Sequence, residues 1–316
     1  MRVVHLASGS VTVRERPTPT VSPGFALLRL RVAGICNTDL ELQRGYYGFE
    51  GVPGHEFVAD VVEADDSAWV ERRVVGEINL ACGNCGWCER GLGRHCPARR
   101  VLGIVNHAGA FAEYFTLPIA NLHAVPESMA DEVAVFTEPV AAACEILEQT
   151  EVKPGTRVAV LGDGKLGLLI AMVLRLHGAE VDLYGRHPEK KAIAAELGVR
   201  PCKAGESGGA KYPLVVDATG SEEGLAAAIA LSEARGTVVM KSTVARPVSV
   251  DMASVIVPEI TLLGSRCGRF EDALPLLSSG RMPVERLIQA VYPLGEASAA
   301  FAHASRKGTL KILLRP

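Results

Sequence analysis

The pattern of apolar and polar positions changes in character near residue 130. Up to about residue 125, apolar residues form short or alternating runs, such as ALLRLRVAGIC and EFVADVVEA, separated by glycine and proline. Such runs are typical of strands in a small barrel or sandwich. From residue 131, DEVAVFTEPVAAACEILEQT has the apolar spacing of a helix, and its alanine-rich run favours one. We therefore expect a β-rich part followed by a part that contains helices.

The second part alternates strands and helices. The segment TRVAVLGDGKLGLLIAMVLRLHGAEVDLYGRHPEKKAIAAELG predicts strand, helix, strand and helix in turn. YPLVVDATG, GTVVMKS and ITLLGS add strand-like runs, and PLGEASAAFAHASRKGTLKILLRP predicts a helix and a terminal strand. This alternation indicates a parallel sheet with crossover helices, so the predicted fold class is α/β.

Length and charge limit the classes of function. A chain of 316 residues is long enough for two domains, each with its own core. The formal charge is −3, and lysine and arginine are spread along the chain, which argues against nucleic acid as a partner. The first residues resemble neither a signal peptide nor a transit peptide, and glycine and charged residues interrupt the longest apolar stretch. We therefore expect a cytoplasmic globular protein without a membrane segment.

Half of the eight cysteines lie in one glycine-rich segment, CGNCGWCERGLGRHC. The spacing C-x2-C-x2-C-x7-C lets the thiolates of Cys82, Cys85, Cys88 and Cys96 turn toward one centre. A reducing cytosol disfavours disulfides, and four thiolates fit a closed, structural zinc site. An iron–sulfur cluster also uses four thiolates and is the alternative.

A second motif, GDGKLG, follows an apolar strand and precedes an apolar helix. Gly162 permits a tight turn, Gly164 lets the backbone approach a pyrophosphate, and Gly167 lets the helix pack on the strand. The free N–H groups at the start of the helix then face the phosphates. The motif in this context predicts a dinucleotide-binding turn. The alternative is a glycine-rich turn without a ligand.

The end of the next strand bears on the choice of cofactor. NAD-binding units place there an acidic residue that holds the ribose 2′-hydroxyl. Here that place is taken by Gly185, followed by Arg186, while Asp182 lies earlier in the strand. An absent carboxylate leaves room for a 2′-phosphate, with which a guanidinium can pair. The pattern favours NADP over NAD, and the alternative is that Arg186 is only a solvated surface charge.

Three further segments, GICNTDL, VPGHEFV and FTEPVAA, carry residues of metal-ligand type. A thiolate, an imidazole and a carboxylate would leave the fourth position of a zinc ion open, as catalysis requires. Spacing alone does not show that these residues meet, because they are spread over a hundred positions. The residues concerned are Cys36, Thr38, Asp39, His55, Glu56 and Glu138.

The motifs GICNTD, GHE, the four-cysteine loop, EP and GDGKLG occur together and in one order. On these motifs the chain resembles, from end to end, the zinc-dependent medium-chain dehydrogenases/reductases, which include alcohol, sorbitol, threonine and glucose dehydrogenases. The resemblance implies a GroES-like β-barrel catalytic domain at 1–139, completed by 267–316, and a Rossmann dinucleotide-binding domain at 140–266. It also implies a homodimer or homotetramer.

The resemblance assigns roles to the metal-ligand residues. It implies two zinc ions per chain, a catalytic one on Cys36, His55 and Glu138 and a structural one on the four clustered cysteines. Glu56 resembles a residue that in some members approaches the metal and exchanges with water. Asp39 resembles the carboxylate that orients the histidine ligand.

The resemblance also implies a route for the proton. Thr38 resembles the hydroxyl that takes the alcohol proton, while Glu41 stands where many members have a relay histidine. Glu41 could serve as the terminal base, or it could be a solvent-facing carboxylate, and the second interpretation is slightly favoured.

Several residues are expected to contact the cofactor besides the glycines. Lys311 resembles the late basic residue that members use against the pyrophosphate, and Arg266 falls where the chain returns to the catalytic domain. Either residue could instead be a surface cation. The expected contacts are completed by Lys165, Leu166 and Thr219.

The sequence therefore predicts a zinc-dependent, NADP-preferring oxidoreductase acting on small alcohols or polyols, or on the corresponding carbonyl compounds. Two alternatives are an enzyme of the same fold dedicated to one large biosynthetic substrate and a catalytically silent nucleotide-binding protein.

Overall fold

The chain divides into two compact units in its computed structural model, which describes residues 1–206, 209–242 and 247–316. The first unit contains Met1–Glu138 and Ala273–Pro316, and the second contains Pro139–Asp272. The order of units is the one expected from the sequence. The second boundary falls later than 266/267, inside helix α9 (Phe270–Ser278).

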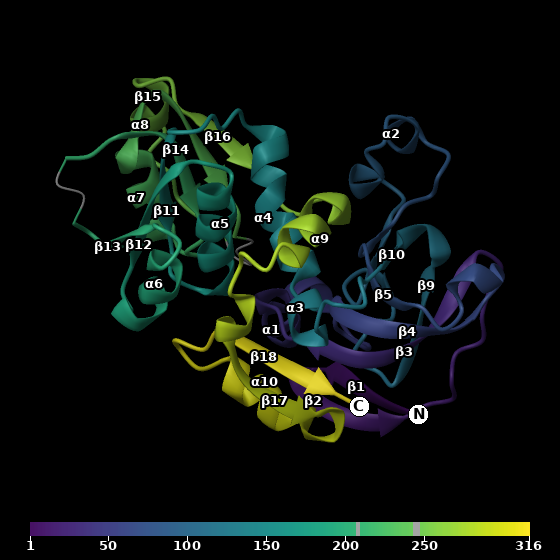
Figure 1. Cartoon of the computed structure of the whole chain (residues 1–316). Helices are drawn as coiled ribbons and strands as arrows, with labels where there is room; N and C mark the ends of the chain where they lie inside the picture. Colours follow the sequence, from purple (N-terminus) through teal and green to yellow (C-terminus); the bar gives the residue numbers. More distant parts are fainter. Residues whose placement is uncertain (207–208, 243–246) are drawn as a thin grey trace. The chain divides into compact units, whose positions relative to one another are not determined.

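The first unit is built on a seven-stranded sheet (Figure 1). Its order is β10-β5-β4-β3-β18-β17, and β9 also pairs with β3. In β3 the exposed Arg29 and Arg31 alternate with buried apolar residues, as a strand covered on one face requires. The strands are β3 (Phe25–Gly34), β4 (Glu56–Ala64), β5 (Arg73–Gly76), β9 (Tyr114–Pro118), β10 (Leu122–Ala124), β17 (Ile288–Pro293) and β18 (Lys311–Arg315).

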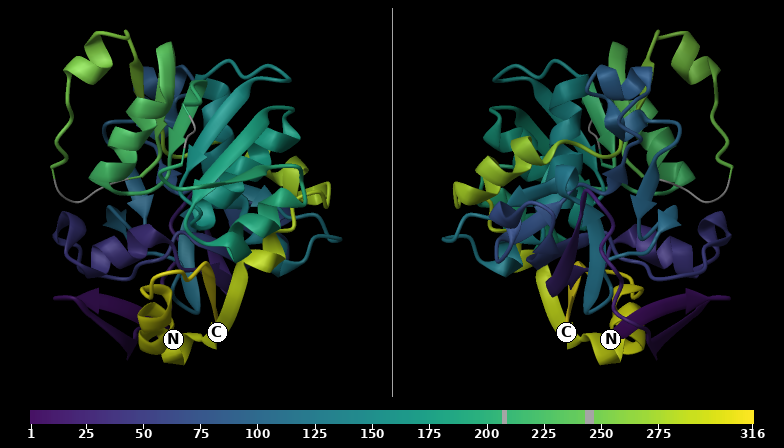
Figure 2. Two further views of the ribbon diagram at one scale, coloured as in Figure 1. Left: turned by 90° about the vertical axis from the view of Figure 1, so that its left-hand side faces the viewer. Right: turned by 90° about the vertical axis from the view of Figure 1, so that its right-hand side faces the viewer.

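Both ends of the chain contribute to this unit. Figure 2 shows the N-terminal hairpin, β1 (Arg2–Ala7) and β2 (Ser10–Glu15), beside the C-terminal segment that contains α10 (Ala297–Ala304). The rings of Phe111 and Phe301, both fully buried, pack edge to face with centroids 6.0 Å apart. The C-terminal segment therefore completes the core of the first unit.

Short elements surround this sheet. Strands β6, β7 and β8 form a small three-stranded sheet next to the cysteine segment. The helix expected from residue 131 is present as two helices, α3 in the first unit and α4, most of which belongs to the second unit. The bounds are β6 (Asn79–Leu80), β7 (Arg100–Leu102), β8 (Asn106–His107), α1 (Asn37–Gln43), α2 (Gly86–Glu89), α3 (Asp131–Ala134) and α4 (Thr137–Gln149).

The second unit contains the expected parallel sheet, with strand order β13-β12-β11-β14-β15-β16. Along the chain, β12 and β13 are added on one side of β11, and β14, β15 and β16 are added on the other side. Right-handed crossovers therefore place α5 and α6 on one face of the sheet and α7 on the other. The elements are β11 (Arg157–Leu161), α5 (Lys165–Leu176), β12 (Glu180–Gly185), α6 (Pro188–Ala195), β13 (Arg200–Lys203), β14 (Tyr212–Asp217), α7 (Glu222–Leu231), β15 (Ser232–Met240), α8 (Ala253–Ile256) and β16 (Thr261–Gly264).

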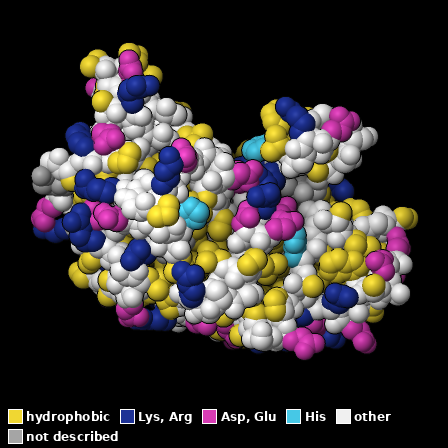
Figure 3. Space-filling view, turned by 45° about the horizontal axis from the view of Figure 1, so that its top comes forward, with side chains coloured by type: hydrophobic (Ala, Val, Ile, Leu, Met, Phe, Trp, Pro, Cys, Tyr) yellow, Lys and Arg dark blue, Asp and Glu magenta, His cyan; other side chains and the backbone are white. Residues whose placement is uncertain are grey.

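The surface carries charges of both signs. In the face drawn in Figure 3, acidic and basic side chains of the described residues are interspersed. Within the described ranges, no helix has the length and apolar character that a membrane crossing needs.

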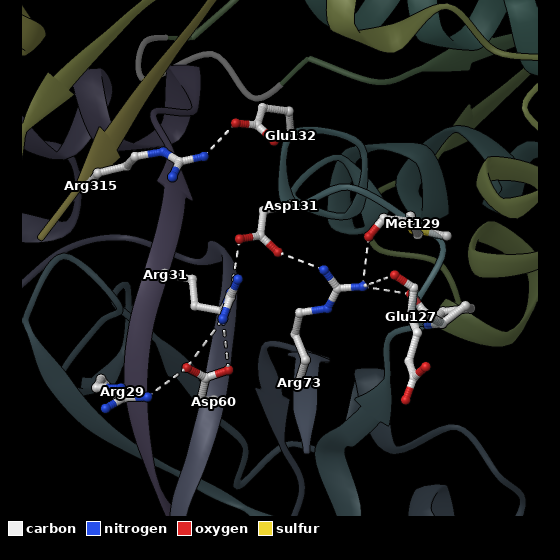
Figure 4. A network of polar contacts seen from close by, with 10 residues as sticks. Arg29, Arg31, Asp60, Arg73, Glu127, Met129, Asp131, Glu132 and Arg315 are labelled. Carbon is white, nitrogen blue, oxygen red and sulfur yellow. Dashed lines mark hydrogen bonds and ion pairs between the residues drawn. The ribbon is translucent and has the colours of Figure 1, made fainter. Parts of the chain in front are cut away.

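A buried polar network fixes the segment that leads into α3 (Figure 4). Arg73 Nη2 donates to the carbonyls of Pro126, Glu127 and Met129 at 2.6, 3.3 and 2.6 Å. Its Nη1 donates to Asp131 Oδ1 at 3.0 Å, and Asp131 Oδ2 accepts from Arg31 Nε at 2.8 Å. Figure 4 shows Asp131 between the two guanidinium groups. One carboxylate thus joins β3, β5 and the start of α3.

Replacing Asp131 by Asn should destabilise the first unit. Arg73, whose side chain is 20% exposed, loses the charge of its buried acceptor, whereas Arg31 is 40% exposed and keeps Asp60 as a partner. The free energy of unfolding should therefore fall by about 2 kcal/mol, mostly through Arg73. Urea unfolding followed by tryptophan fluorescence measures this, because both tryptophans, Trp69 and Trp87, lie in the first unit.

The adjacent Glu132 provides a matched control. It pairs with Arg315, and their side chains are 39% and 42% exposed. Glu132→Gln should cost less than about 0.5 kcal/mol, because exposed ion pairs contribute little. An equal loss in both variants would contradict the network's importance.

Candidate metal and dinucleotide sites

The four clustered cysteines lie around one point. Their Sγ atoms are 3.5 to 3.9 Å apart in the four measured pairs, and all lie within 4.8 Å of one another. Four thiolates about 2.3 Å from a single tetrahedral ion would be about 3.8 Å apart. All eight cysteines are free, so the cluster holds no disulfide. The donor set and spacing fit one zinc ion, whereas an iron–sulfur cluster needs room for several atoms between the thiolates.

The thiols of this cluster differ in acidity. The backbone N–H of Cys88 lowers the pKa of Cys85 to about 7. The backbone N–H of Asn84 would lower the pKa of Cys82, but its thiol contacts, first with Cys96, and its burial raise that pKa to about 11. The sulfur atoms therefore do not all ionise easily side by side. A bound dication would compensate their charge and hold them as thiolates.

A second cluster is organised by Asp39, which is fully buried in the first turn of α1. Asp39 Oδ2 accepts from the backbone N–H of Cys36 at 2.8 Å, as the acidic residue of a capping box does. Its Oδ1 accepts from the N–H of Gly54 at 3.2 Å and lies 3.4 Å from His55 Nδ1. Gly54 has a φ of +101°, and a Cβ there would overlap the ring of Phe111. One carboxylate thus positions both the Cys36 and the His55 loops.

The position of Asp39 determines which atom of His55 is available. Nδ1 faces the carboxylate, which leaves Nε2 for a metal. Burial alone would lower the pKa of His55, but Asp39 and then Cys36 raise it well above its ordinary value. A metal ion would therefore have to displace a proton from this ring.

The carboxylate that the structure brings to this cluster is Glu56. The ligand atoms of Cys36, His55 and Glu56 lie within 4.8 Å of one another. Among the described residues, Glu138 is not part of this group; it lies in the first turn of α4 and is partly buried. The structure thus differs from the expected arrangement, in which Glu138 is the ligand and Glu56 its exchange partner. The ligand role of Glu138 stays a prediction.

Glu56 is held by a buried ion pair with Lys311, and both side chains are 1% exposed. The pair forms because β3 lies between β4, which begins at Glu56, and β18, which begins at Lys311. Gly34, opposite Glu56 on β3, leaves the necessary space, because a Cβ there would overlap Glu56 Oε2. The Lys311 ammonium also lies 5.4 Å from the centre of the Phe136 ring. Lys311 is therefore engaged by Glu56 and is not a surface cation, and its expected contact with a pyrophosphate stays a prediction.

Two residues of α1 bear on proton transfer. Thr38 Oγ1 lies 3.8 Å from Cys36 Sγ, so its hydroxyl is next to the expected metal ligand. Glu41 Oε1 accepts from Arg44 Nη1 at 2.6 Å, in an i,i+3 pair at the surface. This pairing agrees with the interpretation of Glu41 as a solvent-facing helix carboxylate.

The glycine turn of the second unit has the form that a phosphate requires. Gly162 has a φ of +109°, and its N–H donates to the Tyr184 carbonyl at 2.9 Å. A Cβ on Gly167 would overlap the carbonyl of Gly162, so this glycine is needed for close packing. A Cβ on Gly164, in contrast, would meet nothing within 4 Å, and no side chain caps α5. The open space and the start of a helix without a side-chain cap therefore fit an anionic ligand.

Most other expected cofactor residues lie at the same edge of the parallel sheet. Strands β11, β12, β14 and β16 end there, because all run parallel. Lys165 and Leu166 follow β11, Thr219 follows β14 and Arg266 follows β16. Thr219 Oγ1 donates to Asp217 Oδ1 at 2.7 Å. Ligands of open α/β sheets bind at the carboxyl ends of the strands.

The end of β12 differs from what the sequence suggested. Arg186 is exposed, as expected, but the space beside Gly185 is not empty. A Cβ on Gly185 would overlap the side chain of Asp163, the second residue of the glycine turn. The sequence motifs alone assign no role to Asp163. The one sequence signal for it is an acidic residue inside the turn together with a glycine at the end of the next strand.

Comparisons with known proteins agree with these sites. The family profile "Alcohol dehydrogenase GroES-like domain" matches residues 22–127, and the profile "Zinc-binding dehydrogenase" matches residues 166–279. The starvation-sensing protein RspB of Escherichia coli K12 is 30% identical, over 96% of each chain. This chain belongs to the zinc-type medium-chain dehydrogenases/reductases. The expected fold class and family are thereby confirmed.

Other members that are similar to this zinc-type dehydrogenase act on polyols, according to their names. A sorbitol dehydrogenase of Halalkalibacterium halodurans is 27% identical over 98% of this chain and 96% of its own. A D-altritol 5-dehydrogenase of Agrobacterium fabrum is 29% identical over 98% of both chains.

Two solved structures of members cover essentially the whole chain. A zinc-binding dehydrogenase of Sinorhizobium meliloti bound to NADP has a TM-score of 0.90 and 28% identity, covering 100% of this chain and 99% of its own. The RspB alcohol dehydrogenase of Escherichia coli CFT073, in complex with NADH, has a TM-score of 0.92 and 27% identity with the same coverage. The two relatives carry different dinucleotides.

Removing the carboxylate of Asp39 should weaken metal binding at Cys36 and His55. Asp39→Ala releases the Cys36 N–H and the His55 ring, and loss of such a supporting contact typically lowers zinc affinity by about 10–100-fold. Competition with a chromophoric chelator measures the affinity of this site separately from the four-cysteine site. Glu41→Gln, on the same helix but paired with Arg44, should leave the affinity unchanged. Equal affinities in Asp39→Ala and the wild type would contradict the assigned role.

Proposed function

We propose that this protein is a zinc-dependent oxidoreductase that transfers a hydride between a polyol or other small alcohol, or the corresponding carbonyl compound, and a nicotinamide dinucleotide. The observation that carries the proposal is the grouping of Cys36, His55 and Glu56 at the buried Asp39, in the same chain as the glycine turn. The names of the similar sorbitol and D-altritol dehydrogenases support polyols as the substrate class.

We assign two zinc ions to each chain. The four-cysteine cluster offers four thiolates and no open position, so its ion is structural. The cluster at Cys36 and His55 offers fewer ligands, with a carboxylate from Glu138 or Glu56, and leaves a position for the substrate oxygen. When bound there, zinc supplies Lewis acidity and the dinucleotide accepts the hydride.

The residues of the chain have distinct tasks in this reaction. Asp39 holds the His55 ring so that Nε2 can face the metal, and it fixes the Cys36 backbone. Thr38, next to Cys36 Sγ, would accept a hydrogen bond from the alcohol and relay its proton, giving up its own hydroxyl proton toward the cofactor ribose. We assign proton transfer to Thr38 and not to Glu41, because Glu41 is paired with Arg44.

The proposal includes a homodimer or homotetramer. Strand β16 is the edge of the parallel sheet, and its outer side has no partner strand within the described residues. Light scattering should therefore give two or four chain masses, and a single chain mass would contradict this part of the proposal.

Zinc content and turnover test the proposed function together. The wild type should contain two zinc ions per chain, and Cys36→Ala should contain one and lose activity. Activity is measured as dinucleotide reduction with a panel of polyols and simple alcohols. Removing a ligand of the metal that polarises the substrate should lower the rate by about a thousandfold or more.

Cys144→Ala is the matched control, since Cys144 is a buried cysteine outside both clusters. It should retain two zinc ions and its activity. One zinc ion in both the wild type and Cys36→Ala would contradict the second metal site. Two zinc ions without turnover of any alcohol in the panel would contradict the proposed substrate class.

A further inference from the structure

β12 ends in a glycine, although the backbone conformation there does not require one. A carboxylate from another segment lies beside this glycine. Gly185 is the last residue of β12, and its φ lies outside the left-handed region. Its lack of a side chain is explained by Asp163, whose Cβ and carboxylate a Cβ on Gly185 would overlap. The two residues meet because β11 and β12 pair in parallel, with Leu161 opposite Tyr184. Asp163 thus fills the place of a side chain at position 185.

The Asp163 carboxylate is fixed and ionised. Its Oδ2 accepts from the backbone N–H of His187 at 2.6 Å, and its Oδ1 lies 3.1 Å from His187 Nδ1. The residue is 7% exposed. Burial would raise the pKa of Asp163, but the backbone and ring of His187 and the charge of Lys190 lower it below its ordinary value. A negative charge is therefore held at this point at neutral pH.

A carboxylate at the end of this strand has a specific chemical meaning in a dinucleotide-binding unit. It accepts hydrogen bonds from the ribose hydroxyls of NAD, and it repels the 2′-phosphate of NADP. We propose that Asp163 replaces the acidic residue missing at position 185 and makes the site select NAD(H) over NADP(H). This inference rests on the proposed function and reverses the NADP preference expected from Gly185 and Arg186.

The neighbouring cations do not remove this selectivity. Arg186 is exposed, and ordering its long side chain on a phosphate costs conformational entropy. Lys191 Nζ is committed to the carbonyls of Gly185 and Cys202, at 3.1 and 2.5 Å. Lys190 is 7% exposed, and its charge lowers the pKa of Asp163. Asp163 is the fixed charge at the strand end, whereas Arg186 is a solvated one.

Equilibrium binding of NADH and NADPH to the full-length, zinc-loaded protein tests the inference without reference to turnover. The wild type should bind NADH more tightly than NADPH. Asp163→Asn keeps the side-chain shape and removes the charge, so the ratio of the two dissociation constants should move toward NADPH by about tenfold or more. Glu189→Gln removes one negative charge from the exposed start of α6 nearby and should leave the ratio within about twofold.

A carboxylate exchange provides a second variant. Asp163→Gly combined with Gly185→Asp places the acid at its usual position, and this double variant should bind NADH in preference to NADPH as the wild type does. Asp163→Gly alone should lose that preference. Thermal melting of each variant shows whether it is folded.

A wild type that binds NADPH as tightly as NADH, or more tightly, would overturn the inference, and so would each of three further results. The first is an unchanged ratio in folded Asp163→Asn. The second is weaker NADPH binding in that variant, accompanied by loss of NADPH binding in Arg186→Ala, which would mean that Asp163 orients a phosphate site. The third is a wild type that binds neither dinucleotide, and only this result would contradict the proposed function as well.

Discussion

The candidate metal site of the first unit depends on one buried carboxylate. Asp39 caps α1 through the Cys36 N–H and faces His55 through its other oxygen, so the helix start and the loop before β4 share one anchor. A fully buried charge is stable only when its neighbours satisfy it. The backbone around Asp39 is therefore constrained to the geometry that also directs a thiol and an imidazole toward one point. The same arrangement thus gives the carboxylate its polar partners and brings the candidate metal ligands together.

At the ends of two strands, a glycine leaves space for a buried carboxylate. Gly34 leaves room for the Glu56 carboxylate, and Gly185 leaves room for that of Asp163. Both glycines have φ outside the left-handed region, so space rather than backbone freedom explains them. In each case a neighbouring segment supplies the charge, and a neighbour compensates it: Lys311 for Glu56, and His187 for Asp163. At these two strand ends, the place of the missing side chain is occupied by the side chain of another residue.

The alternation of apolar runs was sufficient to predict the parallel sheet and its crossovers, because strand and helix periods are local properties. Family membership followed from motif order in the same way. Two details did not follow from the sequence because they concern contacts between distant residues. Lys311 forms a buried ion pair with Glu56, and the space beside Gly185 is occupied by Asp163. Neither contact can be predicted from the residues of one strand, since each depends on which strand lies next to it.

The sequence by itself determined the four-cysteine cluster and the glycine turn. Their residues are a few positions apart, and the chain between them is too short to separate them. Only the tertiary structure decided that Glu56 lies with Cys36 and His55, and that Asp163 lies at the end of β12. The physical reason is that sheet order and register bring these charges together. Sequence spacing does not specify order or register for segments that lie far apart in the chain.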